Sequence, residues 1–295
     1  MPFVATLVSN PATRALAASL AHKVRDALGA SELDWLAEAV ACDIALPAGM
    51  DAAGAAAAIA AALDGAPVDF AVQEQAGRRR KLLIADMDST MIDQECIDEL
   101  ADEVGVKAEV AAITAMAMND EIAFEPALRQ RVALLAGLDE FVFDKLVRDR
   151  ITLAAGAREL VATMRRDGAY TALVSGGFDA FTARIAARLG FNEHRANRLV
   201  MAQGRLTGEV AEPVLGREAK ATALREIAGR LGISLDEVIA VGDGANDLDM
   251  LALAGAGVAL HAKPAVAAMA RIRIDHADLT ALLYLQGYRL SEFAA

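Results

Sequence analysis

Cysteine, histidine and aromatic residues are scarce in this sequence. Its 295 residues include 2 cysteines and 4 histidines, and aromatic residues make up 4% of the chain. Cys42 and Cys96 have no partner at metal-ligand spacing, and the histidines form no zinc pattern. We therefore expect two buried thiols in a protein of the reducing cytoplasm.

Positive charge is also in short supply. The formal net charge is -12, the pI is near 4.9, and the only basic run is Arg78–Lys81. A run this short is more typical of a solvated linker than of a nucleic-acid site, so we expect no binding to DNA or RNA. A small anionic substrate stays compatible with the sequence, provided that local cations or a metal ion offset the charge.

Long apolar runs are absent. The longest, such as residues 52–63, fall short of the roughly 20 residues that span a bilayer, and no basic segment precedes the apolar N-terminus. We expect neither a membrane span nor a signal peptide, and hence a soluble cytoplasmic protein. The length and the hydrophobic content of 55% are sufficient for two or three domains with cores of their own.

The first 80 residues differ from the rest in their pattern. They alternate between strand-like and helix-like segments, which predicts a small α+β domain followed by a polar linker at 75–80. The predicted order is strand 3–10, helix 13–28, a mostly extended segment 33–46, helix 51–65 and strand 68–75.

From Lys81 onward, apolar runs end in polar residues and alternate with amphipathic helical segments. This arrangement predicts a doubly wound, parallel α/β sheet, in which ligands bind at the carboxyl ends of the strands. The predicted strands are 81–88, 169–177, 236–244 and 256–262, and the clearest helices are 154–168 and 219–232. Residues 92–155 show helical patterns only, which predicts an inserted lid, and residues 198–212 predict a hairpin that turns near Gly204.

Two aspartates, Asp86 and Asp88, follow the first apolar run. If the strand continues through them, both side chains lie on the same side, where one can act as a nucleophile and the other as a general acid and base. The alternative is a strand end rich in Asp that caps the next helix. Neighbouring carboxylates repel each other, so a bound cation is the leading explanation for the pair.

A second acidic cluster contains Asp243, Asn246 and Asp247. Carboxylates at the end of a strand can hold Mg²⁺, which prefers oxygen ligands. The alternative is a glycine-rich turn that happens to be acidic. Two acidic strand ends in one sheet make the metal site the better interpretation.

The segment LVSGGF around Ser175, Gly176 and Gly177 joins a predicted strand to a helix that starts near Phe178. Glycines let the backbone approach a ligand, and free N–H groups at a helix start favour phosphate. An ordinary strand-to-helix turn explains this short stretch equally well.

Lys220 lies on the apolar stripe of a predicted helix, in register with Leu224, Ile227 and Leu231. Lysine is rarely buried without a partner, so we expect it to face a carboxylate or a phosphate. The alternative is a lysine whose stem packs at the end of the stripe while its ammonium reaches water.

Arg131 shares a predicted helical stripe with Leu128 and Leu135, and Glu95 opens the helix that follows the aspartate pair. The arginine suits recognition of a carboxylate, although an intramolecular ion pair would explain it as well. The glutamate either complements the helix dipole or receives a cationic group of a substrate.

Together these motifs resemble the haloacid dehalogenase superfamily of phosphotransferases. The resemblance covers about residues 81–290 and rests, in order, on DMDST (86–90), LVSGG (173–177), Lys220 and GDGAND (242–247). Within the superfamily the chain is similar to the phosphoserine phosphatases, through DSTMIDQE with Glu95, the stretch 118–135 and HAKPAV (261–266). The first 80 residues resemble a regulatory ACT-type domain in element order only.

The resemblance implies a division of the chain and an activity. Residues 1–76 would form the ACT-like domain, 81–91 and 156–290 the catalytic core, and 92–155 the helical cap. The expected reaction is Mg²⁺-dependent hydrolysis of O-phospho-L-serine, the last step of serine biosynthesis, and the alternative is action on another small phosphate ester. A homodimer is compatible with this resemblance.

The resemblance also implies a role for each matching residue. Asp86 would be the nucleophile and Asp88 the acid and base. Mg²⁺ would be held by Asp86, the Asp88 carbonyl and Asp243, with Asp247 close by. The substrate would be bound by Ser175, Gly176, Lys220 and Asn246 at its phosphate, Glu95 at its ammonium, Arg131 at its carboxylate, and Met118 and Phe124 in the lid.

Overall fold

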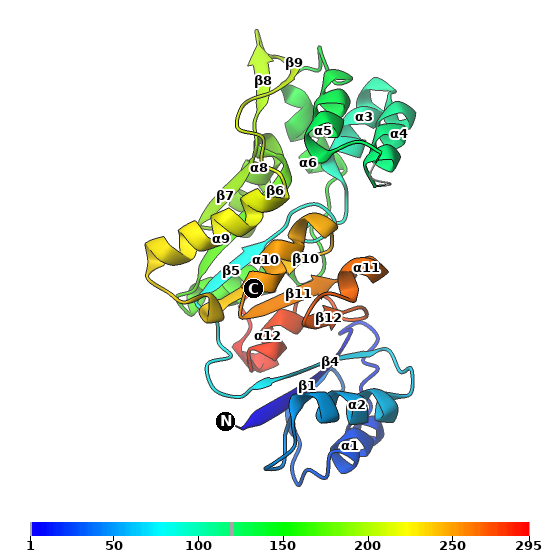
Figure 1. Ribbon diagram of the computed structural model, residues 1–295, viewed down its shortest axis with the longest axis vertical. Helices are drawn as coiled ribbons and strands as arrows, with labels where there is room; N and C mark the ends of the chain where they lie inside the picture. Colours follow the sequence, from blue (N-terminus) through cyan, green and yellow to red (C-terminus); the bar gives the residue numbers. More distant parts are fainter. Residues whose placement is uncertain (1, 119–120, 295) are drawn as a thin grey trace.

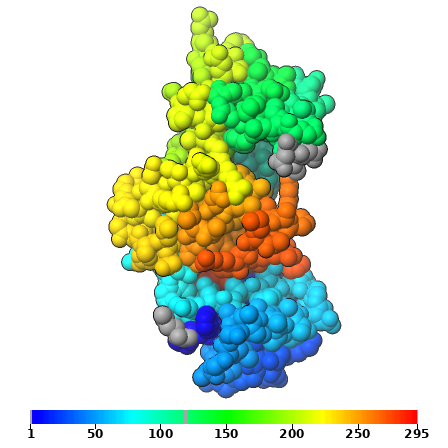
Figure 2. Space-filling model, in the orientation of Figure 1, coloured from blue at the N-terminus to red at the C-terminus, as the bar shows by residue number. Residues whose placement is uncertain are grey.

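The computed structural model describes residues 2–118 and 121–294. Three parts follow one another along the long axis of the molecule: an N-terminal α+β part, a central α/β core, and a group of helices with a hairpin at the far end (Figure 1). In the space-filling view the N-terminal part lies directly against the C-terminal residues of the core (Figure 2).

The N-terminal part is a four-stranded antiparallel sheet with strand order β2-β3-β1-β4. Its elements run β1 (Phe3–Ser9), α1 (Ala18–Ala27), β2 (Asp34–Ala37), β3 (Ala41–Ala45), α2 (Ala52–Leu63) and β4 (Val68–Glu74). This βαββαβ order is that of the ferredoxin-like motif. The α+β class expected for this region is confirmed.

Two local expectations in this part are wrong. The segment 33–46 is not one extended strand but the hairpin of β2 and β3, which turns at Ala39 with a φ of 60°. The helix expected from residue 13 begins only at Ala18. Asn10 explains the delay, because its carbonyl accepts hydrogen bonds from the N–H groups of Thr13 and Arg14 and holds a turn there.

The two faces of the N-terminal sheet have different partners. Leu7 belongs to a cluster with the residues of α1 and α2, whereas its neighbour Val8 belongs to the large core cluster that also contains Leu282 and Tyr284. This alternation follows from the period of two in a strand. The N-terminal part therefore shares a continuous apolar interior with the central core.

A polar contact also joins these two parts. The Asp69 carboxylate accepts hydrogen bonds from the backbone N–H groups of Asp275, His276 and Ala277, at 2.9, 3.0 and 2.8 Å. Asp69 is buried, so these three donors replace the water that its charge would otherwise bind.

The central core is a six-stranded sheet in the order β12-β11-β10-β5-β6-β7, with parallel pairing throughout. The strands are β5 (Leu82–Ala85), β6 (Tyr170–Phe178), β7 (Glu193–Asn197), β10 (Val238–Gly242), β11 (Ala256–Leu260) and β12 (Ile272–Ile274). The predicted doubly wound α/β class is confirmed.

Helices cover both faces of this sheet. On β5, Leu82 and Ile84 join one apolar cluster and Leu83 and Ala85 join the other, as expected for a central strand buried on both sides. The helices of the core are α7 (Ala157–Arg166), α8 (Asp179–Leu189), α9 (Arg217–Leu231), α10 (Leu248–Leu253), α11 (Pro264–Ala267) and α12 (Ala281–Leu285).

The helical insertion lies between β5 and β6. Before α7 it contains α3 (Cys96–Val104), α4 (Lys107–Met118), α5 (Phe124–Ala133) and α6 (Phe141–Asp149). The chain enters and leaves it side by side, because Ile92 and Leu153 form an antiparallel bridge and the Ala154 N–H donates to the Met91 carbonyl. The predicted helical insertion is confirmed.

The predicted hairpin is also present. Strands β8 (Leu199–Ala202) and β9 (Arg205–Val210) are antiparallel and turn at Gly204, and β9 lies against α5. In Figure 1 the hairpin projects at the end of the molecule opposite the N-terminal part.

Within residues 2–118 and 121–294, no helix combines the length and the apolar composition needed to cross a lipid bilayer. Cys42 and Cys96 are free thiols, and both are buried.

Candidate active site

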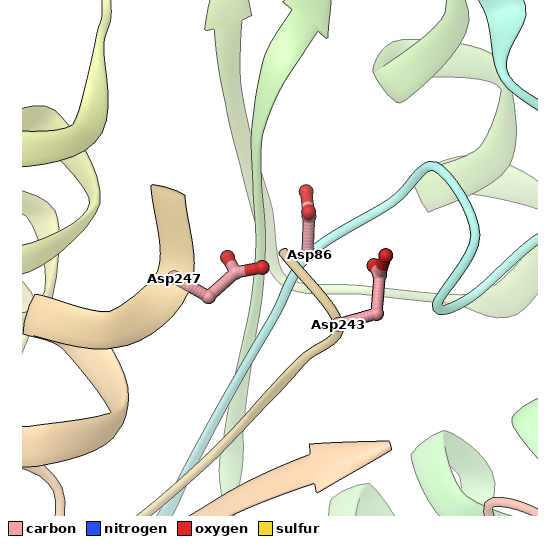
Figure 3. Close-up of side chains that lie close together, drawn as sticks. All are labelled: Asp86, Asp243 and Asp247. Atoms are coloured by element: carbon pink, nitrogen blue, oxygen red, sulfur yellow. The ribbon is translucent and has the colours of Figure 1, made fainter. Parts of the chain in front are cut away.

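Three aspartates converge at the carboxyl ends of β5 and β10 (Figure 3). Asp86 follows β5, Asp243 follows β10, and Asp247 lies in the short 3₁₀ turn η2 (Ala245–Asp247). One carboxylate oxygen from each residue lies within 4.8 Å of the others. Since β5 and β10 are parallel neighbours, their ends meet at one edge of the sheet, which brings the two predicted acidic clusters together.

Lys220 is the cation of this cluster. Its Nζ lies 2.7 Å from Asp86 Oδ2 and 2.6 Å from Asp247 Oδ1, and its side chain is 2% exposed. It projects from the first turns of α9, where the apolar stripe of the helix continues toward the sheet. The expectation that Lys220 faces an anion is confirmed, and the anions that the structure contains are carboxylates.

The charge of the cluster is not balanced. Three carboxylates face one ammonium, so burial and the neighbouring Asp247 raise the pKa of Asp86 well above its usual range, against the opposing effect of Lys220. Burial likewise raises the pKa of Asp243, and a hydrogen bond from Thr90 Oγ1 at 2.8 Å offsets only part of that effect. A cation among these oxygens would relieve the repulsion.

The donor set fits a hard divalent cation. All three side chains present oxygen, the ligand type that Mg²⁺ and Ca²⁺ prefer, and no sulfur or imidazole belongs to the cluster of described residues. Lys220 contacts Oδ2 of Asp86, and the other oxygen, Oδ1, accepts a hydrogen bond from the Met87 N–H at 2.7 Å. We conclude that Asp86, Asp243 and Asp247 could bind a metal ion.

Asp88 reaches the site by a different route from the one expected. Strand β5 ends at Ala85, so strand alternation does not place Asp88 beside Asp86, and that expectation is wrong in its premise. Instead, Asp88 Oδ1 accepts from the Cys96 N–H at 3.0 Å, and Oδ2 accepts from Ser175 Oγ at 3.4 Å. Burial raises the pKa of this carboxyl, which favours its protonated form.

The segment Ser175–Gly177 interrupts the pairing of β6 with β7. The register holds up to Val174 and is resumed, shifted, at Phe178. Within the interruption the Gly177 N–H donates to Ser175 Oγ at 2.9 Å, and α8 begins at Asp179, one residue after the expected start. A methyl group on Gly177 would lie 2.7 Å from Asp88 Oδ2 and 3.1 Å from Ser175 Oγ, so a larger residue at this position would displace the Asp88 carboxylate.

Glu95 lies just before α3 and accepts a hydrogen bond from Ser89 Oγ at 2.8 Å. Burial and the nearby Asp88 raise the pKa of Glu95 to about 7. Ser89 itself adopts a φ of 55°, a conformation that is uncommon outside glycine. Glu95 is exposed at the rim of the site, and the charges of Asp88 and Asp243 act on its carboxyl, so a cationic partner would stabilise its ionised form.

Arg131 occupies the inner side of α5. Its guanidinium donates to the Ala127 carbonyl at 3.3 Å and to Thr114 Oγ1 at 3.2 Å, and within the described residues it makes no ion pair. Burial lowers its pKa, while Asp98 and Glu95 act in the opposite direction. The alternative explanation for Arg131, an intramolecular ion pair, finds no support in the part of the chain that the structure describes.

The two expected lid residues differ in how far they can be placed. Phe124 opens α5, and its ring lies 3.6 Å from the position of a methyl group on Gly176 and 3.5 Å from one on Gly216. The ring thus covers the edge of the site from the cap. Met118 ends α4, and its side chain lies outside the described residues.

Asn246 is the last of the expected site residues. Three further polar residues at the site were not predicted from the sequence. The amide nitrogen of Asn246 lies 3.9 Å from the position of a methyl group on Gly176, beside the interrupted segment of β6. Of the others, Ser89 and Thr90 are inside the DMDST motif, where their position was a usable signal. Asn197, which donates to the Gly176 carbonyl, lies 21 residues from that segment and no local pattern points to it.

Comparisons with known proteins bear on this site. Residues 83–252 match the model of the haloacid dehalogenase-like hydrolases. A phosphoserine phosphatase from Albidiferax ferrireducens is 47% identical over 210 residues, which is 70% of this chain and 89% of that protein. One from Streptomyces coelicolor is 40% identical over 77% of this chain, and the chain spans only 56% of its length.

Solved structures extend the comparison to the N-terminal part. A haloacid dehalogenase family hydrolase from Salmonella enterica serovar Typhi superimposes with a TM-score of 0.85 at 29% identity, covering 96% of this chain and 98% of that one. A phospho-aspartyl intermediate analogue of a phosphoserine phosphatase gives a TM-score of 0.65 at 42% identity, covering 70% of this chain and 98% of that one.

Proposed function

Because the chain belongs to the haloacid dehalogenase-like hydrolase family, we propose that it hydrolyses O-phospho-L-serine to L-serine and phosphate, the last step of serine biosynthesis. One observation carries the proposal. The acidic cluster with Lys220 suits a phosphoryl group, and on its cap side Glu95 and Arg131 offer the opposite charges that an amino acid requires. The similarity to several phosphoserine phosphatases supports the same substrate.

The proposed nucleophile is Asp86, which would attack phosphorus and form an aspartyl-phosphate. Its carboxylate is held on both sides, by the Met87 N–H and by Lys220 Nζ, so that it is oriented before substrate arrives. The phospho-aspartyl analogue known for a related phosphatase supports this assignment.

Asp88 is the proposed general acid and base. Its raised pKa keeps a proton available for the serine oxygen as it leaves, and the resulting carboxylate can then take a proton from the attacking water. Ser175 and the Cys96 N–H hold the carboxyl in place through both steps.

The proposed metal is Mg²⁺, held by the side chains of Asp86 and Asp243 and the backbone carbonyl of Asp88, with Asp247 close by. When bound, it would neutralise charge on the phosphoryl oxygens and on the nucleophile. Lys220 supplies a further positive charge beside Asp86.

The remaining contacts divide between the two ends of the substrate. We assign the phosphate to Ser175, the Gly176 N–H, Lys220 and Asn246. Glu95 would receive the ammonium and Arg131 the carboxylate, while Met118 and Phe124 close the cap over the bound molecule.

The domain boundaries follow from the same assignment. We propose residues 1–76 as an ACT-like regulatory unit that binds serine or mediates a homodimer, 81–91 and 156–290 as the catalytic core, and 92–155 as the cap. The shared apolar interior between the first and second units supports transmission of such a signal. A cytoplasmic location suits the two free thiols.

A second candidate is hydrolysis of another small phosphate ester. The Salmonella structure, a haloacid dehalogenase family hydrolase that covers nearly the whole chain, is compatible with this candidate as well. The two candidates differ in whether both charges of an amino acid are needed.

Phosphate release distinguishes them. The protein is assayed with O-phospho-L-serine, phosphothreonine and p-nitrophenyl phosphate, first with Mg²⁺ and then with EDTA. We expect metal-dependent release with a preference for phosphoserine. Release from p-nitrophenyl phosphate alone would retain the family chemistry and disprove the substrate, and equal release in EDTA would disprove the metal.

A further inference from the structure

Asn197 is a buried residue at the edge of the site that uses its whole carboxamide. Its Nδ2 donates to the Gly176 carbonyl at 2.8 Å and to the Leu215 carbonyl at 3.1 Å, and its Oδ1 accepts from the Leu215 N–H at 2.6 Å. The residue is 1% exposed. Both N–H bonds and an oxygen lone pair are thus assigned to two backbone segments.

The first of these segments is the interruption in β6. Between Val174 and Phe178 the ladder with β7 loses register, and pairing is resumed at Phe178 with Asn197 itself. The Gly176 carbonyl therefore has no place in the regular ladder and is satisfied by the Asn197 side chain instead. Leaving this partly buried carbonyl without a partner would be costly, so the bond from Asn197 stabilises the displaced backbone.

The second segment leads into α9. Leu215 lies two residues before the helix, which starts at Arg217 and presents Lys220 in its first turns. The Asn197 side chain binds both the backbone N–H and the backbone carbonyl of Leu215. The entry to the helix is therefore held relative to Gly176. One side chain thereby ties the β6 interruption to the segment that leads into the helix of Lys220.

The ring of Phe124 rests on the same two segments. It contacts the β6 interruption at Gly176 and the helix entry at Gly216, at 3.6 and 3.5 Å from where methyl groups would lie. Any change in the separation of the segments would alter the surface on which this cap residue settles.

We infer that Asn197 is a positioning residue that holds the phosphate-binding backbone at Gly176 in register with Lys220. This inference rests on the proposed function, because it concerns the phosphate end of the same site. In this role Asn197 contacts neither the ammonium nor the carboxylate of the substrate, and it acts only through the two backbone segments.

Two variants and a matched control test the inference. Asn197→Ala removes all three hydrogen bonds, and Asn197→Asp keeps the volume and the acceptor but loses both donors. Asn192→Ala is the control, because Asn192 also ties backbone between the same two strands, accepting from the Thr171 N–H and Oγ1 at their opposite end. If the alanine variant at 197 fails to fold, the aspartate variant decides.

Three quantities are measured in saturating Mg²⁺: the inhibition constant of inorganic phosphate, the kcat/KM for phosphoserine and for p-nitrophenyl phosphate, and the Tm. We expect both Asn197 variants to weaken phosphate inhibition by at least about tenfold and to lower kcat/KM for the two esters by a common factor of about 10 to 100. Asn192→Ala should leave the inhibition constant of phosphate and the kcat/KM for both esters unchanged.

Two results would overturn the inference. The first is a lowered Tm with unchanged phosphate inhibition, since a merely structural asparagine would behave in this way. The second is a loss confined to phosphoserine, which would place the effect at the amino-acid end. Failure of the proposed function can be distinguished from failure of this inference. If the wild-type protein does not hydrolyse phosphoserine, the Asn197 variants can still be tested with phosphate and p-nitrophenyl phosphate.

Discussion

The acidic cluster and the interface with the N-terminal part both bury aspartate against a cation, but their charge balance differs. At the interface, Asp43 meets Arg78 at 2.5 Å and accepts from Thr6 Oγ1 at 2.6 Å, so one anion faces one cation. At the cluster, Lys220 is shared between Asp86 and Asp247, and Asp243 adds a further carboxylate. The first arrangement balances one negative charge with one positive charge, although the buried Arg78 Nη1 has no hydrogen-bond partner, whereas the second has an excess of negative charge.

This difference separates structural from functional burial of charge. A paired and hydrogen-bonded ion is tolerated in the interior, and its removal leaves the partner exposed to the full cost of desolvation. Surplus charge of one sign costs folding energy and persists where a metal or a substrate completes the balance. The predictions below are ordered from the largest expected effect.

Asp86→Asn should lower kcat with phosphoserine by at least about 10⁴-fold, because the amide cannot attack phosphorus. The measurement is steady-state phosphate release with Mg²⁺, with circular dichroism to establish that the fold persists. A variant with near wild-type turnover would remove the nucleophile assignment.

Asp43→Asn should instead lower the stability of the protein and leave its catalytic rate unchanged. Breaking the nearly buried pair with Arg78 should reduce the free energy of unfolding by about 2–4 kcal/mol, and the kcat of the folded enzyme should stay unchanged. Denaturant unfolding and the same assay provide the two values. Equal losses of stability and of kcat would contradict the separation of the two regions.

Arg131→Ala should lower kcat/KM for phosphoserine by roughly 10- to 100-fold, since it removes charge-assisted hydrogen bonds to the substrate carboxylate. Activity on p-nitrophenyl phosphate should change little. Arg129→Ala is the matched control on the same helix, because Arg129 is partly exposed and pairs with Glu125 and Glu212. Parallel losses on both esters would place Arg131 in a general structural role.

The raised pKa of Glu95, about 7, predicts a pH effect that is specific to the amino-acid substrate. The ammonium binds the carboxylate form, which is lost as the pH falls through 7. The ratio of kcat/KM for phosphoserine to that for p-nitrophenyl phosphate should therefore fall about tenfold from pH 8 to pH 6. Glu95→Gln should abolish this dependence, and a ratio that is flat in the wild type would exclude the role.

The sequence predicted the site better than it predicted the contacts that support it. Apolar runs that end in aspartate marked β5 and β10, and the parallel sheet then brought Asp86 and Asp243 together. The turn at Ala39 was missed because it contains neither glycine nor asparagine. The premise that the strand continues to Asp88 was wrong, because the end of β5 depends on backbone hydrogen bonds that the pattern does not reveal.

Long-range polar contacts were beyond reach for a related reason. The Asp69 side chain binds backbone N–H groups more than 200 residues away, and the Asn197 side chain binds backbone atoms of Gly176 and Leu215. Backbone partners leave no mark on the residue types of the distant segment. Such contacts therefore appear only once the fold brings the segments together.

The most direct test of the surplus charge at the cluster is the Tm of wild type and Asp86→Asn, each measured in EDTA and in saturating Mg²⁺. A carboxyl pKa that folding raises means that stability is lost as the pH rises above the usual carboxyl range, so removal of this charge should help the metal-free protein. The account predicts that Asp86→Asn has the higher Tm in EDTA and that Mg²⁺ raises the wild type more than the variant. A lower Tm for Asp86→Asn in EDTA, with no response of the wild type to Mg²⁺, would contradict it.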